Sequence, residues 1–487
     1  VRTALAGTPA WLVGGAVRDE LLGRPTADVD VVVDGDPARA ARAVAQAGGR
    51  AACFALSEEF GSWRVVARDR SWQVDVEPLR GETIEADLAL RDFTVNAIAR
   101  ELSGGAPIDP LGGIADLGTK RLRMAGPGAF ADDPLRVLRL VRVAVELEME
   151  PDEQALLGAA AQAHGLSRIS GERVFVELRR ILATPHARHG VETLRAIGAM
   201  KAVLPELDAL RGVEQSRFHH LDVYEHTLEV LRGAVELTSG ADASTPLHVD
   251  ARADAASDAD VAPRAAELRA AIGEHGERVT ALLAQPLADE MTRGEALRWG
   301  ALLHDAAKPP TRAVRPLDGR VTFIGHDELG SQLARTVLTR LRASERLRAH
   351  VGGLVRHHLR AGFLVHDPQP LSRRTVFAYL RACSPVAVDV TLLSAVDRLA
   401  TRGDHAEKAI ERHMRVARQL LEGGLDWHAD GPPRPLLRGD ELTAELGIVA
   451  GPRVGAMLER LTEAQYAGEI STRADAVELA RKLAKNI

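Results

Sequence analysis

The sequence predicts an α+β fold, in which a mixed sheet near the N-terminus precedes helical domains. Residues 1 to about 125 alternate short strand patterns with helix patterns, whereas the rest of the chain is helical in its periodicity. The length of 487 residues suffices for about three or four domains. We therefore expect domains at residues 1–125, 126–210, 211–425 and 426–487.

The composition excludes several classes of protein. Hydrophobic residues make up 46% of the chain, so large cores can form, and the net charge of −6 excludes an overall basic coat. Aromatic residues make up only 3%, which disfavours a base-stacking platform. Two cysteines, Cys53 and Cys383, exclude a disulfide scaffold or a Cys₄ zinc site and indicate a reducing compartment. Without a signal peptide or a membrane-length apolar run, we expect a cytoplasmic protein with no membrane partner.

The segment 11–34 predicts a strand, a glycine turn, a helix and a second strand. The paired glycines 14–15 separate the first strand from a helix over residues 16–22, and glycine and proline then end that helix. Asp28 and Asp30 lie two apart on the second strand, so their carboxylates share one face. Adjacent carboxylates repel each other unless a cation lies between them, which indicates Mg²⁺ and a nucleoside triphosphate.

The glycine turn has the chemistry of a phosphate cradle. Gly14 and Gly15 would let backbone N–H groups at a helix start approach phosphate, and Arg18 lies one turn into that helix. A paired glycine alone is usually a turn, and two alternating aspartates alone are usually a solvated strand end. Their combination within one strand–helix–strand unit favours a nucleotide site, although it matches neither a Walker A loop nor a dinucleotide fingerprint.

This unit closely resembles the head of the class II nucleotidyltransferases, which include tRNA CCA-adding enzymes and bacterial poly(A) polymerases. The resemblance implies a polymerase β-like mixed-sheet head followed by a helical neck and body. It also implies that Asp28 and Asp30 hold two catalytic Mg²⁺ ions, and that Gly15 and Arg18 bind the nucleoside triphosphate.

The rest of the head contributes a further helix and two strands. Residues 38–47 are helical by composition, and residues 63–67 and 71–76 read as two strands joined by a turn. Asp75 in the second of these strands is either a third acidic neighbour of the metal ions or an exposed strand residue, and we favour the exposed position.

The segment Leu90–Ala99 resembles the RRDFT-x-NA motif of the family, with Leu90 where an arginine is common. The resemblance implies that Arg91 contacts the triphosphate. Without that resemblance, the pattern of the segment indicates an amphipathic strand or the start of a helix. The segment 108–113 resembles the family's D-P-x-G-G turn, and we expect it to be a hinge without chemistry.

A row of arginines follows at the start of the predicted neck. Asp133 precedes a proline, which predicts a helix N-cap there, and Arg136, Arg139 and Arg142 then recur every three residues. Cations near a helix N-terminus oppose the helix dipole, so a bound anion or base explains them better than a structural role. In the family's [E/D]-D-x-x-R motif, an aspartate and an arginine read the base of CTP or ATP. The resemblance assigns Asp133 and Arg136 to that task and Arg139 and Arg142 to nucleotide binding.

The remainder of the neck, to residue 210, is helical in pattern. Glu172, Arg173 and Glu177 match a signature of the family's neck helix. A charged helix face with i,i+4 pairs explains the same residues equally well.

Residues 211–425 carry histidines and aspartates at separated positions in apolar helix patterns, and such side chains are ligands for divalent metals. Their order resembles the HD phosphohydrolase superfamily. The resemblance implies a divalent metal of unspecified identity on His226, His304, Asp305 and Asp397. It further implies a second metal or a phosphate at three more residues, His326, His358 and Lys308. Metal binding is the expectation, and hydrolase activity stays open.

Two segments complete the helical part of the chain. Residues 239–263 are rich in Asp, Ala and Ser, and read as a disordered acidic linker. Residues 426–487 resemble the C-terminal segment of HD-containing CCA-adding enzymes, and either contact RNA or form a packing cap.

The sequence as a whole predicts a tRNA nucleotidyltransferase that adds C and A to the tRNA 3′ end from CTP and ATP without a nucleic-acid template. The connection over residues 78–90 is shorter than the loop usual in full CCA-adding relatives, which keeps a CC-adding enzyme as an alternative. Two further functions stay open, that of a poly(A) polymerase and that of a metal-dependent HD phosphohydrolase with an RNA-binding head. The sequence assigns no oligomeric state.

Overall fold

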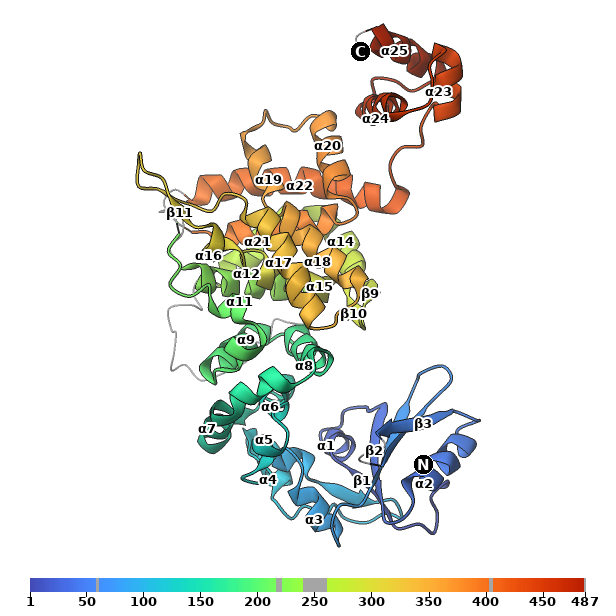
Figure 1. Cartoon of the computed structure of the whole chain (residues 1–487), viewed down its shortest axis with the longest axis vertical. Coiled ribbons are helices and arrows are strands. Elements are labelled where there is room, and N and C mark those ends of the chain that lie inside the picture. Colours follow the sequence, from blue (N-terminus) through green and yellow to red (C-terminus); the bar gives the residue numbers. More distant parts are fainter. Residues whose placement is uncertain (58–60, 216–220, 240–260, 403–405, 486–487) are drawn as a thin grey trace. The chain divides into compact units, whose positions relative to one another are not determined.

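The computed structural model describes the chain except residues 58–60, 216–220, 240–260, 403–405 and 486–487 (Figure 1). The chain divides into two compact units, Val1–Val203 and Leu204–Ile487. The predicted acidic linker lies largely outside the described residues, and its last three residues begin helix α13.

A six-stranded mixed sheet forms the centre of the first unit, as the sequence predicts. Its strand order is β3-β4-β5-β2-β1-β6. Only β2 and β5 pair in parallel, and the other neighbours are antiparallel. The strands are β1 (Ala10–Val13), β2 (Asp28–Val33), β3 (Ala52–Ser57), β4 (Ser62–Val66), β5 (Gln73–Pro78) and β6 (Ala99–Glu101).

The two faces of this sheet differ because strand side chains alternate. Val31 and Val33 of β2 pack against helix α2 (Pro37–Ala47) in one apolar cluster. Val32 faces the other side and packs with helix α3 (Ile84–Ala89). Asp28 and Asp30 share the face of Val32, so they point away from α2 and toward the site described below.

Helices make up most of the rest of the first unit (Figure 1). They are α1 (Gly15–Leu21), α4 (Gly113–Thr119), α5 (Ala129–Asp132), α6 (Arg136–Leu147), α7 (Glu153–Gln162), α8 (Gly171–Ala183), α9 (Ala187–Ala196) and α10 (Ala199–Val203), with short 3₁₀ turns at Thr94–Asn96 and Ala163–Arg168. Strands β7 (Arg121–Leu122) and β8 (Glu150–Pro151) form a small parallel pair.

The predicted N-cap at Asp133 is wrong by two residues, because α6 begins at Arg136 and Leu135 is its N-cap. Asp133 itself is extended, and its carboxylate accepts a hydrogen bond from the Leu135 N–H at 3.0 Å. The aspartate therefore closes a turn ahead of the helix. The second carboxylate oxygen of Asp133 faces the site, where it accepts a hydrogen bond from Arg173.

The second unit is a helical bundle with a large apolar core. Its helices are α11 (Pro205–Asp208), α12 (Val223–Thr238), α13 (Val261–Ile272), α14 (Gly276–Leu283), α15 (Arg293–Leu303), α16 (Lys308–Thr311), α17 (His326–Arg340), α18 (Glu345–His357), α19 (Arg360–Phe363), α20 (Arg373–Cys383), α21 (Ala387–Ala400) and α22 (Ala406–Asp430). Two short hairpins join Pro286–Ala288 (β9) to Met291–Thr292 (β10), and Ala313–Val314 (β11) to Val321–Thr322 (β12); 3₁₀ turns lie at Gly273–His275 and Leu364–His366.

The tail has a core of its own and packs on the bundle. Helices α23 (Gly439–Leu446), α24 (Pro452–Ala467) and α25 (Arg473–Lys485) surround an apolar cluster. Tyr466 of α24 lies against Phe377 of α20 and Trp427 of α22, with ring centroids 5.5 and 6.0 Å away. These contacts are those of a packing cap, and an RNA contact of the tail stays a prediction.

Among the described residues, no single helix is long and apolar enough to cross a membrane. The consecutive helices α20 and α21 meet that criterion together by length and composition, although they are bent by 100°. Their apolar side chains belong to the core cluster of the second unit.

A buried ion pair between α15 and α21 holds the core of the second unit together. The Arg293 guanidinium donates to both carboxylate oxygens of Asp389 at 2.7 and 2.5 Å, and the Asp389 side chain is fully buried. We expect Asp389→Ala to lower the free energy of unfolding by about 3–5 kcal/mol, because it leaves a buried cation without its partner.

A matched control is Asp426→Ala, which breaks the exposed pair of Asp426 with Arg278. We expect that change to cost about 0–1 kcal/mol. Urea unfolding of the full chain measures both values. Equal losses in the two variants would contradict the importance of the buried pair.

Candidate functional site

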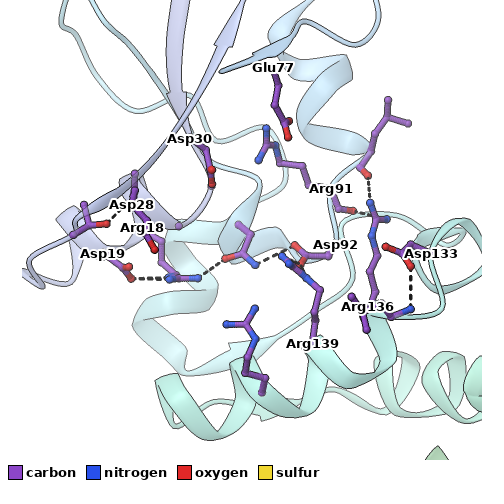
Figure 2. A pocket seen from close by; sticks show the side chains of 18 of the residues that line it. Arg18, Asp19, Asp28, Asp30, Glu77, Arg91, Asp92, Asp133, Arg136 and Arg139 are labelled. Carbon is purple, nitrogen blue, oxygen red and sulfur yellow. Dashed lines mark hydrogen bonds and ion pairs between the residues drawn. The ribbon is translucent and has the colours of Figure 1, made fainter. Parts of the chain in front are cut away.

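A polar cavity of about 530 Å³ lies within the first unit. The β1–α1 turn, the edges of β2 and β5, the segment after α3 and the start of α6 contribute its walls. Every predicted head residue lines this cavity: Gly15, Arg18, Asp28, Asp30, Arg91, Asp133, Arg136, Arg139 and Arg142 (Figure 2). The structure therefore brings together residues that are more than 100 positions apart in the sequence.

The carboxylate of Asp30 is strongly perturbed by its position in the cavity. Burial raises its pKa to about 6, and the nearby charges of Glu77 and Asp75 act in the same direction while Arg91 and Arg139 oppose them. Its partner on the same face, Asp28, lies at the more exposed end of β2. A buried carboxylate beside a second one fits a divalent cation, since hard oxygen ligands are those that Mg²⁺ prefers.

The prediction of an exposed Asp75 is wrong. Arg64 of β4 donates to both of its carboxylate oxygens at 2.7 Å, and the side chain is only 16% exposed. Asp75 does not line the cavity, whereas Glu77, two residues further along β5, does. The parallel register pairs Asp30 with Asp75 and Val32 with Glu77, so this face of β5 follows the acidic face of β2.

The glycine turn packs closely against the charged groups. Gly14 has φ of +67°, and a Cβ there would lie 3.1 Å from Nη1 of Arg91 and 3.6 Å from Oδ2 of Asp30. Only glycine adopts this backbone conformation without strain and leaves room for both side chains. The turn thus sets how near Arg91 and Asp30 come to each other.

A chain of hydrogen bonds fixes the cationic walls (Figure 2). Arg18 donates to the side-chain oxygen of Asn96 at 2.6 Å, and the Asn96 amide donates to Asp92 at 3.0 Å. Arg139 lies on the other side of Asp92, at 2.5 Å. Asp92 and Asn96 come from the Leu90–Ala99 segment, which therefore braces two cavity arginines. Arg91 pairs separately with the buried Asp87 at 3.3 Å.

The charges of Asp92 and Arg139 follow from the geometry of these hydrogen bonds. Burial alone would raise the pKa of Asp92, but Arg139 and the Asn96 amide outweigh it, and the pKa falls well below its ordinary value. Asp92 in turn raises the pKa of Arg139, against the effect of burial. Both groups are therefore charged at neutral pH.

The two residues expected to read the base are also held in place. Asp133 accepts from Arg173 of α8 at 2.8 Å, and Arg136 donates to the backbone oxygens of Leu90 at 2.9 Å and Ala129 at 3.1 Å (Figure 2). Sequence analysis did not assign Arg173 to the cavity, because its partner is 40 residues away in the sequence.

Arg142 has a different environment from the other arginines of the row. It is buried and donates to Glu177 of α8 at 2.6 Å and to Glu146 at 2.7 Å. Since Glu177 is also buried, it is not part of a solvated helix face. Sequence analysis missed Arg180, which lines the same cavity and pairs with Glu146.

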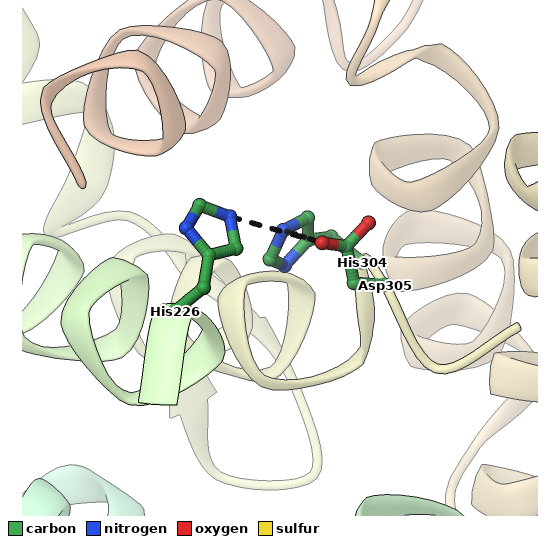
Figure 3. Close-up of side chains that lie close together, drawn as sticks. All are labelled: His226, His304 and Asp305. Carbon is green, nitrogen blue, oxygen red and sulfur yellow. Dashed lines mark ion pairs between the residues drawn. The ribbon is translucent and has the colours of Figure 1, made fainter. Parts of the chain in front are cut away.

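A second cluster of functional groups lies inside the second unit. His226 of α12, His304 after α15 and Asp305 converge there (Figure 3), and Asp305 also converges with His326 and His358. The ligand atoms within each of these groups of three lie within 4.8 Å of one another. Asp305 belongs to both groups.

The backbone orients three of these imidazoles for metal binding. Nδ1 of His304, His326 and His358 lies 2.8, 2.7 and 2.7 Å from the carbonyl oxygen three residues earlier. An Nδ1–H that donates to a carbonyl leaves the Nε2 lone pair as the metal ligand. Burial and the neighbouring His304 lower the pKa of His358 to about 4, so its imidazole is neutral.

Asp397 and Lys308, which the sequence resemblance places in this cluster, also lie beside it. Oδ1 of Asp397 lies 3.0 Å from Nε2 of His226. Nζ of Lys308 lies 2.7 Å from Oδ2 of Asp305 and donates to Gln215 at 2.6 Å. A buried set of imidazoles and carboxylates fits divalent metal ions, whose identity the donors leave open.

Comparison with protein families matches three segments of the chain. Residues 10–123 match a poly A polymerase head domain, residues 148–211 a probable RNA and SrmB-binding site of polymerase A, and residues 273–402 an HD domain. The HD match includes the cluster described above except His226, which lies before it.

Proteins similar over almost the whole chain are tRNA-processing enzymes. An A-adding tRNA nucleotidyltransferase of Deinococcus radiodurans is 36% identical over 95% of this chain and 93% of the relative. A CC-adding tRNA nucleotidyltransferase of Thermus thermophilus is 33% identical over 96% of this chain and 92% of the relative.

Solved structures share the fold. The CCA-adding enzyme of Thermotoga maritima in complex with tRNA has a TM-score of 0.60 at 17% identity, covering 100% of this chain and 94% of that one. These likenesses confirm both the mixed-sheet head with its helical body and the resemblance drawn from the motifs. The chain therefore belongs to the tRNA nucleotidyltransferase family and is a nucleotidyltransferase with an HD domain.

Proposed function

We propose that this protein adds nucleotides from CTP and ATP to the 3′ end of tRNA, with Asp28 and Asp30 as the ligands of two Mg²⁺ ions. The observation that carries this proposal is one cavity that contains paired carboxylates, a glycine turn and a wall of arginines. When bound, Mg²⁺ would supply the charge that activates the tRNA 3′-hydroxyl and neutralises the leaving pyrophosphate.

The chain's own residues position the reactants. Arg18, Arg91 and Arg139 each have a carboxylate or amide partner that fixes the guanidinium, and Arg18 has both, in Asp19 and Asn96, so they offer the triphosphate preoriented donors. Arg142 supports them from a buried position beside Glu177. Bidentate donation from such groups suits phosphate oxygens better than a flexible lysine would.

Asp133 and Arg136 select the base. A carboxylate accepts from an exocyclic amino group and a guanidinium donates to ring acceptors, and both C and A present such a pair of groups. Arg173 holds the Asp133 carboxylate in place for this task. The tRNA would be held by its shape and phosphates rather than by its sequence, in the cytoplasm, where the free thiols of Cys53 and Cys383 stay reduced.

Partial addition is the second candidate for the same site. The connection between β5 and Arg91 is short and contains helix α3, whose Ile84 and Leu88 are buried in the sheet cluster. An ordered helix there leaves no long flexible loop beside the nucleotide. The two relatives named above, similar over nearly the whole chain, are an A-adding and a CC-adding enzyme. CC addition alone is therefore a specific alternative to full CCA addition.

Three tRNA transcripts test these functions, ending before CCA, after C and after CC. Each is incubated with Mg²⁺ and CTP, ATP or both, and product lengths are read on a sequencing gel. If the protein adds the whole CCA end, we expect each transcript to be extended whenever the nucleotide that it lacks next is supplied. Addition that stops after two C residues shows a CC-adding enzyme, and extension of only the last transcript by ATP shows an A-adding one.

Long A tracts in the same assay would indicate a poly(A) polymerase. The double variant Asp28→Ala, Asp30→Ala is the control and should add nothing, since it removes the metal ligands. Extension by this variant, or no extension by the native chain on any transcript, would contradict the proposed site.

Gly14→Ala should lower kcat/KM for nucleotide addition by about tenfold to 100-fold, because the new Cβ displaces the Arg91 guanidinium. The matched control is Gly7→Ala. Gly7 also has a positive φ, of +84°, but a Cβ there meets nothing within 4 Å. Both variants carry the same kind of backbone strain, so equal losses of activity would show that strain, and not the contact with Arg91, is responsible.

The raised pKa of Asp30 predicts a pH-dependent need for Mg²⁺. As the pH falls through about 6, the buried carboxylate takes up a proton, and proton and metal compete for it. The Mg²⁺ concentration for half-maximal rate should rise about tenfold from pH 7 to pH 5. Glu77→Gln removes a charge that raises this pKa, so its profile should shift to lower pH. Identical Mg²⁺ requirements at pH 5 and 7 would contradict this assignment.

A second activity is phosphoester hydrolysis at the HD cluster. The observation in its favour is the pair of ligand groups that share Asp305. Two metal ions side by side can hold a phosphate and activate water, and Lys308 adds a cation beside them. The sequence also leaves open that the head only binds RNA and that the HD cluster is the sole catalytic site. Extension in the transcript assay would contradict that alternative.

The shared ligand makes a stoichiometric prediction. The native chain should bind two Mn²⁺ ions, Asp305→Ala should lose both, and His358→Ala should lose one, as measured by equilibrium dialysis and metal analysis. His428→Ala, which changes an exposed histidine of the same unit, is the control and should keep both. An unchanged helical circular-dichroism signal and urea midpoint of the full chain show that each variant is folded. Loss of one ion only in Asp305→Ala would contradict the shared carboxylate.

A further inference from the structure

The HD cluster opens into a cavity that is much larger than a phosphate group. The cavity has a volume of about 1040 Å³, which lies at the upper end of what small-molecule sites offer. Asp305, His326, His358 and Asp397 line its metal-binding part. A phosphate group at the metal cluster would fill only part of this cavity. The remaining walls would therefore contact the rest of the bound phosphoester.

Two arginines on adjacent helices line this remainder. Asp397 and Arg398 line the cavity from α21, and so do Ser394 and Thr401, which lie one turn before and after them. This face of α21 therefore runs from the metal cluster to the wall that holds the arginines. Arg412 lines it from α22. His413 lies beside Arg412 and makes a buried hydrogen bond to Ser394 of α21 at 3.1 Å, which fixes the two helices against each other.

Neither arginine makes an ion pair with an acidic side chain within the part of the chain that the structure describes. The Nε of Arg398 is buried and makes no hydrogen bond there. By contrast, Arg402 pairs with Glu267 at 2.6 Å, and Arg415 of α22 pairs with Glu411 at 2.8 Å.

The other walls are apolar and aromatic. Phe323, Ile324 and Phe363 line the cavity, and Phe363 is 67% exposed. The Phe323 ring also lies 5.4 Å from Nζ of Lys308, at the metal end. Flat apolar surface beside cations suits a nucleobase attached to phosphate, because bases stack on aromatic rings irrespective of their sequence.

We propose that Arg398 and Arg412 form a second phosphate-binding site, so that the HD cavity takes a nucleotide with two phosphate groups, one at the metal cluster and one at these arginines. This proposal rests on the hydrolase function proposed for the HD cluster. The two phosphates belong either to an RNA 3′ end that carries a terminal phosphate or to a free nucleoside bisphosphate. In hydrolysis, water adds to the terminal phosphorus, the bond to the 3′ oxygen breaks, and that oxygen leaves as a hydroxyl while inorganic phosphate departs.

The test compares three probes with the Mn²⁺-loaded full chain. These are a ribodinucleotide with a 3′-phosphate, adenosine 3′,5′-bisphosphate and adenosine 3′-monophosphate. Equilibrium binding and phosphate release are measured for the native chain, for the double variant Arg398→Gln, Arg412→Gln, and for the control Arg415→Gln, whose arginine is already paired. Arg398→Lys keeps the charge and shows whether a loss reflects folding.

We expect the native chain to bind a two-phosphate probe at least about tenfold more tightly than the monophosphate. The double variant should lose this preference while its affinity for the monophosphate stays unchanged, and the control and Arg398→Lys should keep it. Preference for the dinucleotide alone identifies an RNA end, and preference for the bisphosphate identifies a free nucleotide.

Equal binding of all three probes by the native chain, or an unchanged preference in the double variant, would overturn the second phosphate site. Binding with the expected preference but without phosphate release would contradict hydrolysis at the HD cluster and leave the second phosphate site supported. The two proposals therefore fail separately.

Discussion

The ion pair between the buried Asp92 and the partly exposed Arg139 connects the sheet of the first unit to the helix that carries the arginine row. Burial of the Asp92 carboxylate costs desolvation energy, which its partner and further hydrogen bonds offset. Asp92 has them, since it accepts from its neighbour's backbone N–H at 2.8 Å and from the Asn96 amide. Because Asn96 also accepts from Arg18, the same pair aligns α1, the segment after α3 and α6 around one cavity.

Much of this cavity could be predicted from the sequence because its residues lie in short linear patterns. Two aspartates two apart on a strand share a face whatever the rest of the chain does, and paired glycines at a helix start favour a phosphate site when such a strand follows them. The same logic placed the strands and the mixed sheet. The roles of Glu77 and Asp75 could not be predicted, because they depend on the register between β2 and β5 and on the position of Arg64 in a third strand.

The partners of the cavity arginines also could not be predicted from the sequence. Arg173 reaches Asp133 across 40 residues, and Glu177 reaches Arg142 across 35. Local spacing alone predicts i,i+4 pairs, and Arg142 does make one, with Glu146. The long-range partners exist because α6 and α8 pack side by side, and packing of helices is a property of their apolar faces rather than of their charges.

The metal cluster of the second unit shows the opposite situation. The residue types and their order predict metal binding, but only the folded chain shows that one carboxylate is common to both ligand groups. The hydrogen bonds from His304 and His358 to carbonyls three residues earlier explain why histidines at the C-terminal ends of helices serve well here. The C-terminal end of a helix exposes carbonyls that need donors, and a histidine ring can satisfy one while it offers its other nitrogen to an ion.

The alternation of β2 makes folding and catalysis in the head inseparable. Val31 and Val33 enter the core on one face while Asp28 and Asp30 form the acidic face on the other. A slip of the strand by one residue would turn both carboxylates into the apolar layer beneath α2 and expose the valines to the cavity. A misregistered head would therefore lose its core and its metal ligands in the same event. Selection for a stable sheet thus protects the active site against this error without any separate safeguard.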